Sequence, residues 1–305
     1  MLLELIVVSV IAASTPLLLA AAGELVTERA GVLNLGVEGM MIMGAACGFA
    51  GAYFTDSTLL GALCGIAAGA ALAAMFAALT LGLAVNQVAT RLALTIIGIG
   101  ISGLIGAGFV GERITPAPHL ALPGLSALPF VGSVLFGQDA FVYCSVLLIL
   151  AIRWFLYRTR PGLVLRAVGD NHASAHALGY PVLRIRLLAV LFGGGCAGLA
   201  GAYLSLAYTP FFTAGMTAGR GWIALALVVF ASWRPLRLVA GAYLFGAVTI
   251  LQLHAQGAGM GITPQLMAAL PYLATILVLV AISGTRRMAG STAPASLGVP
   301  FVPDR

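Results

Sequence analysis

The sequence predicts an all-α fold, a polytopic transmembrane helical bundle of about eight or nine spans that includes one short or re-entrant element. Of the 305 residues, 61% are hydrophobic and 8% are charged, with a mean hydropathy of +1.08. In a soluble protein about a quarter of the residues are charged. Small residues also recur at every fourth position, as in Gly61, Gly65 and Gly69, and such stripes let membrane helices approach closely. A soluble enzyme and a disordered chain are both excluded.

Eight apolar stretches are long enough to cross a bilayer, which takes roughly 20 helical residues. A ninth apolar run, 222–233, is only about twelve residues long and predicts a short or re-entrant element buried in protein. Residues 1–284 therefore form one membrane domain, and the prolines and small polar residues of 285–305 predict a disordered cytoplasmic tail. The eight stretches are 5–22, 38–54, 58–85, 92–111, 139–157, 187–208, 238–254 and 265–283.

The distribution of arginine predicts the orientation, because short loops rich in Arg stay in the cytoplasm. The segment from Arg153 to Arg186 carries six Arg and one acidic residue, which makes the loop 158–186 cytoplasmic. Alternation of the spans then puts the N-terminus outside and the C-terminus inside, in a multi-pass protein of the cell inner membrane. The net charge of +6 forms no basic stripe long enough to follow a phosphate backbone, so a nucleic-acid polymer is excluded as a partner.

The cytoplasmic loop contains the pattern of a short isolated helix. Asn171, or Asp170 before it, suits the N-cap position, and Gly179 followed by Pro181 predicts the stop after Leu178. Such a helix has about two turns and is roughly 12 Å long. Because it is too short to be stable alone, it needs a partner surface. A plain connector is the alternative, and a docking element explains the pattern better.

A second stretch interrupts the apolar pattern before the span 38–54. Asn34 and Glu38 stand among glycines directly before that span, which places them at or below the membrane surface. A glycine-interrupted helix start is typical of the broken helices that transporters use at a substrate site. The alternative is that Glu28 and Glu38 pair with Arg29 or Arg91 at the interface. The predicted solute pathway comprises Asn34, Glu38, Asn86, Gln87, Trp222 and Gln252.

Three shorter patterns have structural explanations. The match of 98–103 to G-x-G-x-x-G lacks the strand and the acidic residue of a dinucleotide site, so it is a packing stripe. Ser102 with His254 suggests the nucleophile and base of an intramembrane serine protease, which stays as an alternative class. His172 and His176 have the spacing of a metal edge but no third ligand nearby, and no metal is predicted.

Three long blocks carry a resemblance to a known family. They are GELVTERAGVLNLGVEGMM at 23–41, LRAVGDNHASAHALGYPVLRIR at 165–186 and TAGRGWIALALVVFASWRPLRLVAGAYLFGA at 217–247. Together they resemble the permease subunits of bacterial ATP-binding-cassette (ABC) importers of the branched-chain amino acid and ribose type. Within that family, the nucleoside and simple-sugar uptake permeases are the most similar. Order and spacing also fit, so the resemblance runs from about residue 10 to 284.

The resemblance implies a chain that moves solute and hydrolyses nothing. ATP and Mg²⁺ would be bound by a separate cytoplasmic ATPase, and no cofactor is expected on this chain. An extracytoplasmic binding protein would deliver the solute, and a second, different and longer permease would complete the pore. The expected solute is a nucleoside or a related small polar molecule. The alternatives are a simple sugar of the ribose type and, outside the family, a secondary transporter or channel.

The resemblance also assigns roles to residues of the cytoplasmic loop. Its short helix would be the coupling helix that inserts in a groove of the ATPase. Placement alone suggests that Glu24 and Arg29 form a charge pair at the inner gate. The residues expected to couple to the ATPase are Arg166, Gly169, Asp170, Asn171, Ala175, Leu178 and Gly179.

Overall fold

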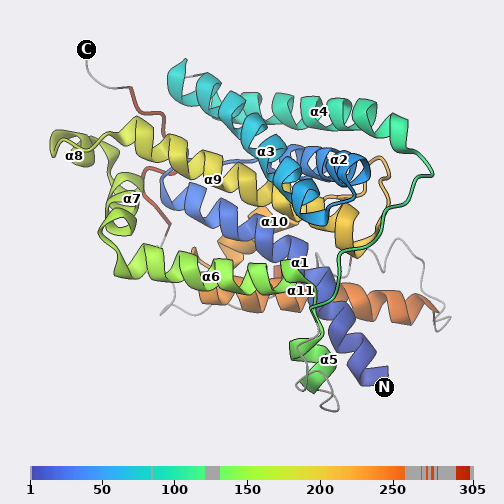
Figure 1. Ribbon diagram of the computed structural model, residues 1–305. Helices are drawn as coiled ribbons and strands as arrows, with labels where there is room; N and C mark the ends of the chain where they lie inside the picture. The colour runs from blue at the N-terminus through green and yellow to red at the C-terminus, as the bar shows by residue number, and fades with distance from the viewer. Residues whose placement is uncertain are drawn as a thin grey trace.

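The computed structural model describes residues 2–83, 85–120, 131–257 and 293–302, together with the isolated positions 269, 273, 276, 277 and 280. These residues form helices and no strands, which confirms the all-α class (Figure 1). Seven of the described helices are long and apolar enough to cross a membrane. They are α1 (Leu2–Arg29), α2 (Val37–Thr55), α3 (Thr58–Ala77), α4 (Gln87–Gly106), α6 (Ala140–Arg158), α9 (Val182–Tyr203) and α11 (Pro235–Gly257).

These seven helices correspond to the first seven predicted stretches, and the eighth, 265–283, lies outside the described residues apart from the isolated positions. The largest difference is in α1, which continues past the predicted end at residue 22 to Arg29. The extension carries Glu24 and Glu28 into the protein, where both are about 1% exposed. An apolar pattern misses such a helical turn because each of the two carboxylates accepts from a protein donor rather than from water.

Four shorter helices connect or insert between the spans: α5 (Val131–Phe136), α7 (Arg160–Asp170), α8 (His172–Ala177) and α10 (Arg220–Phe230). Helix α10 occupies the ninth predicted run. With 11 residues it is about 16 Å long, roughly half the thickness of the hydrocarbon core. It packs against α1, α2 and α11, so the predicted short element buried in protein is confirmed.

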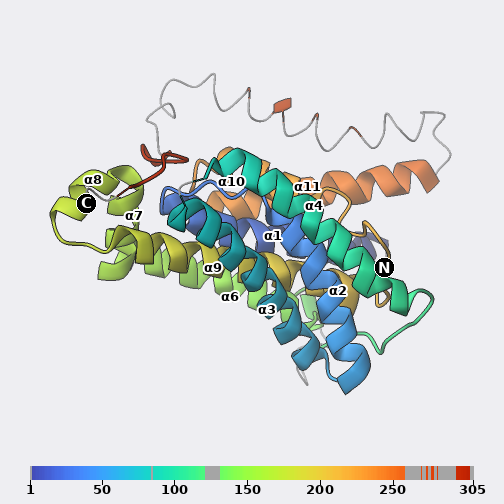
Figure 2. The same ribbon diagram turned by 90° about the horizontal axis from the view of Figure 1, so that it is seen from above.

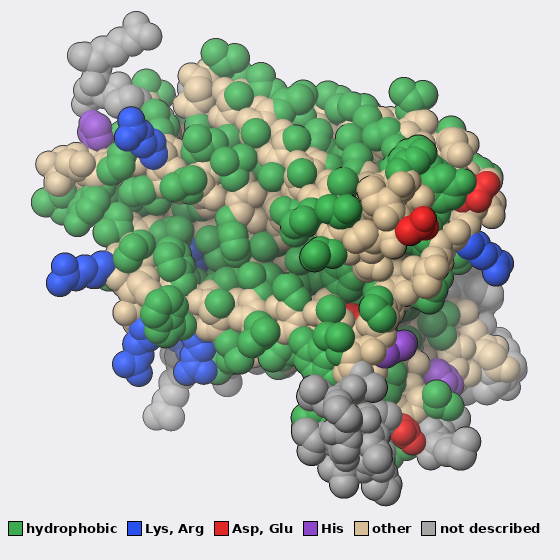
Figure 3. Space-filling model, in the orientation of Figure 1, with side chains coloured by type: hydrophobic (Ala, Val, Ile, Leu, Met, Phe, Trp, Pro, Cys, Tyr) green, Lys and Arg blue, Asp and Glu red, His purple; other side chains and the backbone are tan. Residues whose placement is uncertain are grey.

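Helices α1 and α9 run side by side through the middle of the bundle (Figures 1 and 2). Helices α2, α3 and α4 lie on one side of this pair, and α6 and α11 lie on the other side. Helices α7 and α8 extend from one end of the bundle. In Figure 3, arginine side chains gather at that end, acidic side chains lie toward the opposite end, and hydrophobic side chains cover the face between them.

The predicted small-residue stripes lie where α2, α3 and α9 meet. A Cβ atom added at Gly44 would collide with the backbone of Gly198, and one at Gly69 would collide with Gly194 O. One added at Gly65 would collide with Gly44 O. The three helices are therefore in contact through their backbones, with no room for a methyl group. A Cβ at Gly98 would collide with Gly39, whereas nothing lies within 4 Å of Gly100 or Gly103.

Residues 293–302 pack against the end of the bundle that carries α8, which corrects the prediction of disorder for this part of the tail. Ser296 N donates to Gly169 O at 2.9 Å, and Ser296 Oγ donates to Asp170 O at 3.3 Å. Arg186 Nη1 donates to Val299 O at 3.0 Å. Composition suggested disorder because most of these contacts use backbone groups, which leave little trace in a sequence.

Candidate functional site

The loop between α1 and α2 turns back into the protein. Gly31 has a φ of +84°, in the left-handed region that glycine adopts freely, and it follows shortly after the end of α1 at Arg29. Asn34 N then donates to Glu24 Oε1 at 2.9 Å, and Gly36 N donates to Asn34 Oδ1 at 3.1 Å. Asn34 is 1% exposed. Helix α2 therefore begins inside the protein, beside polar groups of α1.

Glu38, in the first turn of α2, binds the N-terminal end of α10. Its Oε1 accepts from Thr217 Oγ1 and, at 3.0 Å, from Gly219 N. Its Oε2 accepts from Gly221 N at 2.7 Å. A buried carboxylate is stabilised in this way by charge-assisted hydrogen bonds and by the positive end of the helix dipole. The partner of Glu38 is thus the end of a helix, rather than an arginine as in the alternative interpretation.

The other end of α10 is bound by α1. Arg29 Nη2 donates to Trp233 O at 2.9 Å, and Trp233 Nε1 donates to Glu28 Oε2. Ser232 and Trp233 have φ of 50° and 54°, so the chain leaves α10 through a left-handed turn. Because polar groups of α1 and α2 bind both ends of α10, this short helix cannot shift along its axis without breaking these hydrogen bonds.

A second buried polar cluster involves α1 and α4. Arg91 is fully buried, and its Nη2 donates to Gln87 Oε1 at 2.7 Å. The carboxylates of Glu24 and Glu28 lie within electrostatic range of Arg91. Among the described residues, the buried atoms Glu24 Oε2, Gln87 Nε2, Arg91 Nε and Arg91 Nη1 have no hydrogen-bond partner. Buried polar atoms are usually satisfied, so this cluster is an unusual polar region in the interior of the bundle.

Four of the six predicted pathway residues lie at these two polar regions. Asn34 and Glu38 lie at the start of α2, and Gln87 belongs to the Arg91 cluster. Trp222 follows directly on Gly221 at the N-terminal end of α10, and 39% of its surface is exposed. Sequence reasoning missed Thr217, whose hydroxyl donates a hydrogen bond to Glu38. Nothing in the local pattern of 209–219 indicates that contact.

The other two predicted pathway residues lie elsewhere. Asn86 is exposed, and its Oδ1 caps α4 by accepting from two backbone N–H groups at 2.9 and 3.2 Å. Gln252 lies on α11 beyond Gly246, which packs on Ser14 in the first half of α1. Glu38 instead follows the inward loop that begins at the opposite end of α1, where Asn34 N donates to Glu24. The hydrophobic pattern predicts how deep a residue lies in the membrane, but it does not predict which helix that residue contacts. It therefore did not distinguish these positions.

The proposed gate pair is also not brought together. Glu24 accepts from Asn34 N and lies near Arg91, whereas the guanidinium of Arg29 donates to Trp233 O. Two residues five positions apart in a helix are separated by about 140° around its axis. Glu24 and Arg29 therefore face different neighbours.

The predicted short helix in the cytoplasmic loop is α8. Asn171 is its N-cap, with Oδ1 accepting from Ser174 N at 2.9 Å, and Gly179 follows its end with a φ of +86°. Six residues give a length of about 9 Å, slightly less than predicted. Ala175 is buried at 3% exposure, whereas Leu178 is 78% exposed. One face of α8 thus packs on the protein, and its C-terminal end is open to a partner.

Helix α7 connects α8 to the body of the protein. A Cβ atom added at Gly169 would collide with Arg29 O and would lie 3.2 Å from Gly31 N. Arg166 lies over the ring of Tyr157 at 5.2 Å from its centroid. The backbone of α7 is therefore in direct contact with the point where α1 ends and the inward loop begins.

The two histidines of α8 contact an aromatic ring. The ring of Phe301 lies 5.2 Å from those of both His172 and His176. His172 Nδ1 lies 3.1 Å from Arg186 Nη2, and partial burial together with this guanidinium lowers the pKa of His172. Within the described ranges no group of three or more His, Cys, Asp or Glu side chains could hold a metal ion.

The protease alternative finds no support in the geometry. Ser102 Oγ donates to Ile99 O at 2.9 Å within its own helix. The Nδ1 atom of His254 lies 2.9 Å from Ile250 O, also within its own helix. A nucleophile needs a base within hydrogen-bond reach, and no such bond joins these two side chains in the part of the chain that the structure describes.

Comparison with known proteins identifies the family. The family model for the branched-chain amino acid transport system permease component matches residues 6–283. The chain is 46% identical over 289 residues to a putative glucose ABC transporter permease protein of Haloferax volcanii, covering 88% of each chain. It is 30% identical over 314 aligned positions to the guanosine ABC transporter permease protein of Bacillus subtilis, covering 98% of this chain and 97% of the relative.

A nucleoside ABC transporter permease protein of Lactococcus lactis is 29% identical over 316 aligned positions, with 98% of this chain and 97% of the relative covered. These matches extend over the inward loop, α10 and the segment with α7 and α8. The seven apolar helices agree with a multi-pass membrane protein. The chain therefore belongs to the branched-chain amino acid transport system permease component family and is a permease subunit of an ABC importer.

Proposed function

We propose that this chain forms one half of the pore that imports a nucleoside or a related small polar solute, and that α8 is its coupling helix for a cytoplasmic ATPase. The observation that carries the proposal is the position of α8. Just after this helix, the exposed Leu178 lies at the arginine-rich end of the molecule. Gly169, in the preceding helix α7, contacts the backbone of Arg29. A force applied to α8 is thus delivered to the end of α1.

The contacts continue from there to the polar interior. The loop after Arg29 leads to Asn34 and Glu38, and Glu38 binds the N-terminal end of α10. When ATP binding closes the ATPase dimer, displacement of α8 would shift this loop and α10 together. Alternating access by rocking of packed helices has this general form. The chain itself would bind neither ATP nor Mg²⁺, which belong to the ATPase, and it would carry no cofactor.

The chemistry of the interior supports the solute class. An indole at Trp222, amides at Asn34 and Gln87 and the neighbouring carboxylates offer a stacking surface with hydrogen-bond donors and acceptors, which suits a nucleobase with its ribose. The same groups suit a simple sugar, and the 46% identity to a putative glucose permease favours a sugar as the second candidate. Both solutes would reach the pore from an extracytoplasmic binding protein.

The proposed orientation puts α7, α8 and the C-terminal segment in the cytoplasm and the N-terminus outside. Figure 3 supports it, because the arginines gather at the end that carries α7 and α8. The contacts of residues 293–302 with Gly169, Asp170 and Arg186 place the tail at the same end. A second, longer permease is proposed to complete the pore.

The deciding experiment measures uptake of radiolabelled nucleosides, ribose and glucose in cells with and without this gene, and again with the partner ATPase inactivated. ATPase-dependent loss of nucleoside uptake is the expected result. Loss of glucose or ribose uptake alone would replace the nucleoside with a sugar. Uptake that survives inactivation of the ATPase would overturn the assignment of the energy source.

The coupling role is tested with two variants of α8. Ala175→Pro breaks the helix, and Leu178→Glu changes its exposed end without touching the core. Both are expected to abolish ATP-driven uptake while the protein stays correctly inserted. Leu3→Glu, the same change at a leucine that is 65% exposed at the other end of the molecule, is the control. Normal uptake by inserted Ala175→Pro protein would contradict the role of α8.

A further inference from the structure

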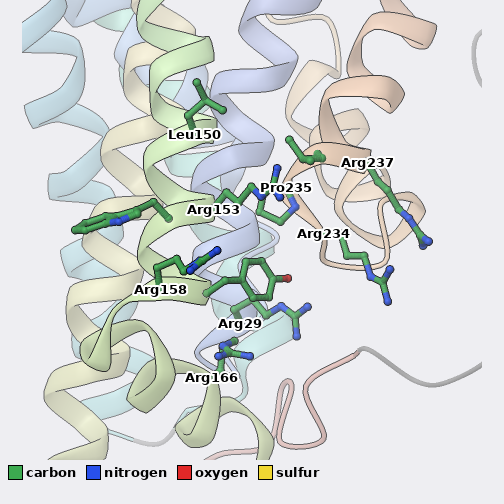
Figure 4. Close-up of a pocket in the computed structure, with 11 residues that line it drawn as sticks. Arg29, Leu150, Arg153, Arg158, Arg166, Arg234, Pro235 and Arg237 are labelled. Atoms are coloured by element: carbon green, nitrogen blue, oxygen red, sulfur yellow. The ribbon is translucent and has the colours of Figure 1, made fainter.

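A large cavity with arginine walls lies where α6 ends and α11 begins (Figure 4). Its volume is about 850 Å³, and it is separate from the polar interior around Glu38. The close-up shows arginines from both sides of the cavity, from α6 and α7 on one side and from the start of α11 on the other. The arginines that line it are Arg29, Arg153, Arg158, Arg166, Arg234 and Arg237.

The cavity concentrates positive charge without a carboxylate in its wall. Six of the fifteen basic residues of the chain line it, and among the described residues no Asp or Glu does. Arg166 Nε is buried there without a hydrogen-bond partner. Guanidinium groups are planar donors that match the oxygens of a phosphate or carboxylate. An anion with several acceptor oxygens is the ligand that this charge distribution fits.

The remaining wall is apolar and open to the surroundings of the bundle. Leu150, Trp154 and Leu236 line the cavity with 51%, 64% and 48% of their surfaces exposed. Trp154 and Leu150 lie about one turn and two turns, respectively, before the end of α6 at Arg158, toward the middle of the span. The cavity therefore combines cations at the end of two spans with an apolar surface that extends along α6 toward the membrane interior.

We propose that this cavity binds the phosphate headgroup of an anionic phospholipid of the cytoplasmic leaflet, with the acyl chains lying along Leu150 and Trp154. Basic pockets between membrane helices on the cytoplasmic side suit such headgroups. A free phosphate would use the arginines but not the apolar wall. The proposal rests on the proposed orientation of the chain, and it does not depend on which solute is carried.

The test uses the purified, full importer complex and counts retained lipids by native mass spectrometry. Phosphatidylglycerol is compared with zwitterionic phosphatidylcholine of the same chain length. The variant Arg153→Gln/Arg158→Gln removes two cavity arginines that lie outside the solute pathway and the coupling helix. The matched control Arg160→Gln/Arg184→Gln removes two exposed arginines of the same cytoplasmic region that do not line the cavity.

Wild type and the control are expected to retain phosphatidylglycerol in preference to phosphatidylcholine. The cavity variant should lose this preference by about tenfold or more, because each basic residue at an anionic lipid surface contributes about fivefold in affinity. Size-exclusion profiles identical to wild type would establish that the variant is folded. Because the readout is lipid binding, it can succeed even if the proposed solute is wrong.

Three outcomes would overturn the proposal. Equal retention of the two lipids by wild type would show that the cavity has no preference for an anionic headgroup. Displacement of phosphatidylglycerol by millimolar inorganic phosphate would assign the cavity to a free anion. Unchanged lipid retention in the cavity variant, together with loss of the co-purifying ATPase, would make the arginines a protein contact instead.

Discussion

Two regions of this permease are held together by different combinations of contacts. Where α2, α3 and α9 meet, glycines such as Gly44 and Gly198 bring backbones into contact with no side chain between them. At the start of α2, Gly221 of α10 also approaches the Glu38 backbone closely, but here the contact includes hydrogen bonds that Gly219 N and Gly221 N donate to one carboxylate, Glu38. The first region has no space in which to move. The second depends in part on directional bonds, which can be exchanged.

This difference indicates which region is the scaffold and which is the moving part. Helices packed through their backbones have one stable arrangement, because a small shift of one helix along the other would separate the glycines that are in contact. Hydrogen bonds to a helix end can be replaced by others, from water or from a solute. The buried unpaired atoms beside Arg91 lie in the adjoining cluster of α1 and α4, which is joined to the start of α2 by the hydrogen bond from Asn34 N to Glu24, and they supply such alternatives. Changes in the first region should therefore affect folding, and changes in the second should affect transport.

The largest effect is expected from Gly198→Val. The new side chain would collide with Gly65 O and with Gly69 Cα of α3, and we expect a destabilisation of about 3 kcal/mol or more, with loss of inserted protein. Gly100→Val is the control, because nothing lies within 4 Å of that glycine. Thermal unfolding of detergent-solubilised protein measures both. Equal melting temperatures would show that the backbone contact is not rigid.

The next largest effect is expected from Glu38→Ala. Three donors at the start of α10 would lose their acceptor, which should lower stability by about 2–3 kcal/mol and uptake at least tenfold. Glu38→Gln keeps part of the acceptor and should be intermediate. Glu112→Ala, at an exposed glutamate, is the control. Uptake by Glu38→Ala at the control rate would remove α10 from the moving region.

A smaller effect, on uptake alone, is expected from Gln87→Ala and Asn34→Ala. Each removes an amide from the polar interior, and uptake should fall several-fold with little change in melting temperature. The neighbour Asn86 should give the opposite result. Because Asn86 only caps α4, Asn86→Ala should cost about 1 kcal/mol of stability and leave uptake unchanged. Normal uptake kinetics in Gln87→Ala and Asn34→Ala would exclude both from the pathway.

The smallest effect concerns the tail at α8. Partial burial is the main cause that lowers the pKa of His172, and Phe301 of the tail packs against this ring, so the docked state disfavours protonated His172. The undocked state therefore binds more protons as the pH falls below the usual value of 6.5, and the tail should loosen toward acid and stay docked above neutrality. Hydrogen exchange at Ser296 N and Gly298 N, normalised to intrinsic rates, measures this. His172→Gln should abolish the pH dependence.

The sequence predicts the spans well because hydrophobicity is a local property. Seven stretches, the short α10 and the capped helix α8 all follow from the composition or from capping residues such as Asn171 and Gly179. The sequence-based predictions are wrong where a polar side chain is hydrogen-bonded to a residue distant in the chain instead of to water. Helix α1 carries Glu24 and Glu28 beyond its apolar run because Asn34 and Trp233 donate to them.

The candidate site was only half predictable for the same reason. Polar residues at membrane depth are rare, so Asn34, Glu38 and Gln87 stand out by their type. Which of them meet depends on how the helices are rotated and paired. Gln252 has the same signal but lies on α11 near the other end of α1.

The sequence by itself determined that this is a membrane bundle with a broken helix start, a short buried element and a short helix in an arginine-rich loop. The lengths of the apolar stretches, the spacing of the glycines and the capping residues are local features of the sequence. Each acts on residues within a few positions in the chain, so the structure that it favours can be predicted without the fold. Only the tertiary structure decided that Glu38 binds α10, that Gly169 contacts Arg29, and that six arginines share one cavity. These contacts join residues far apart in the chain, and their geometry follows from the packing of whole helices.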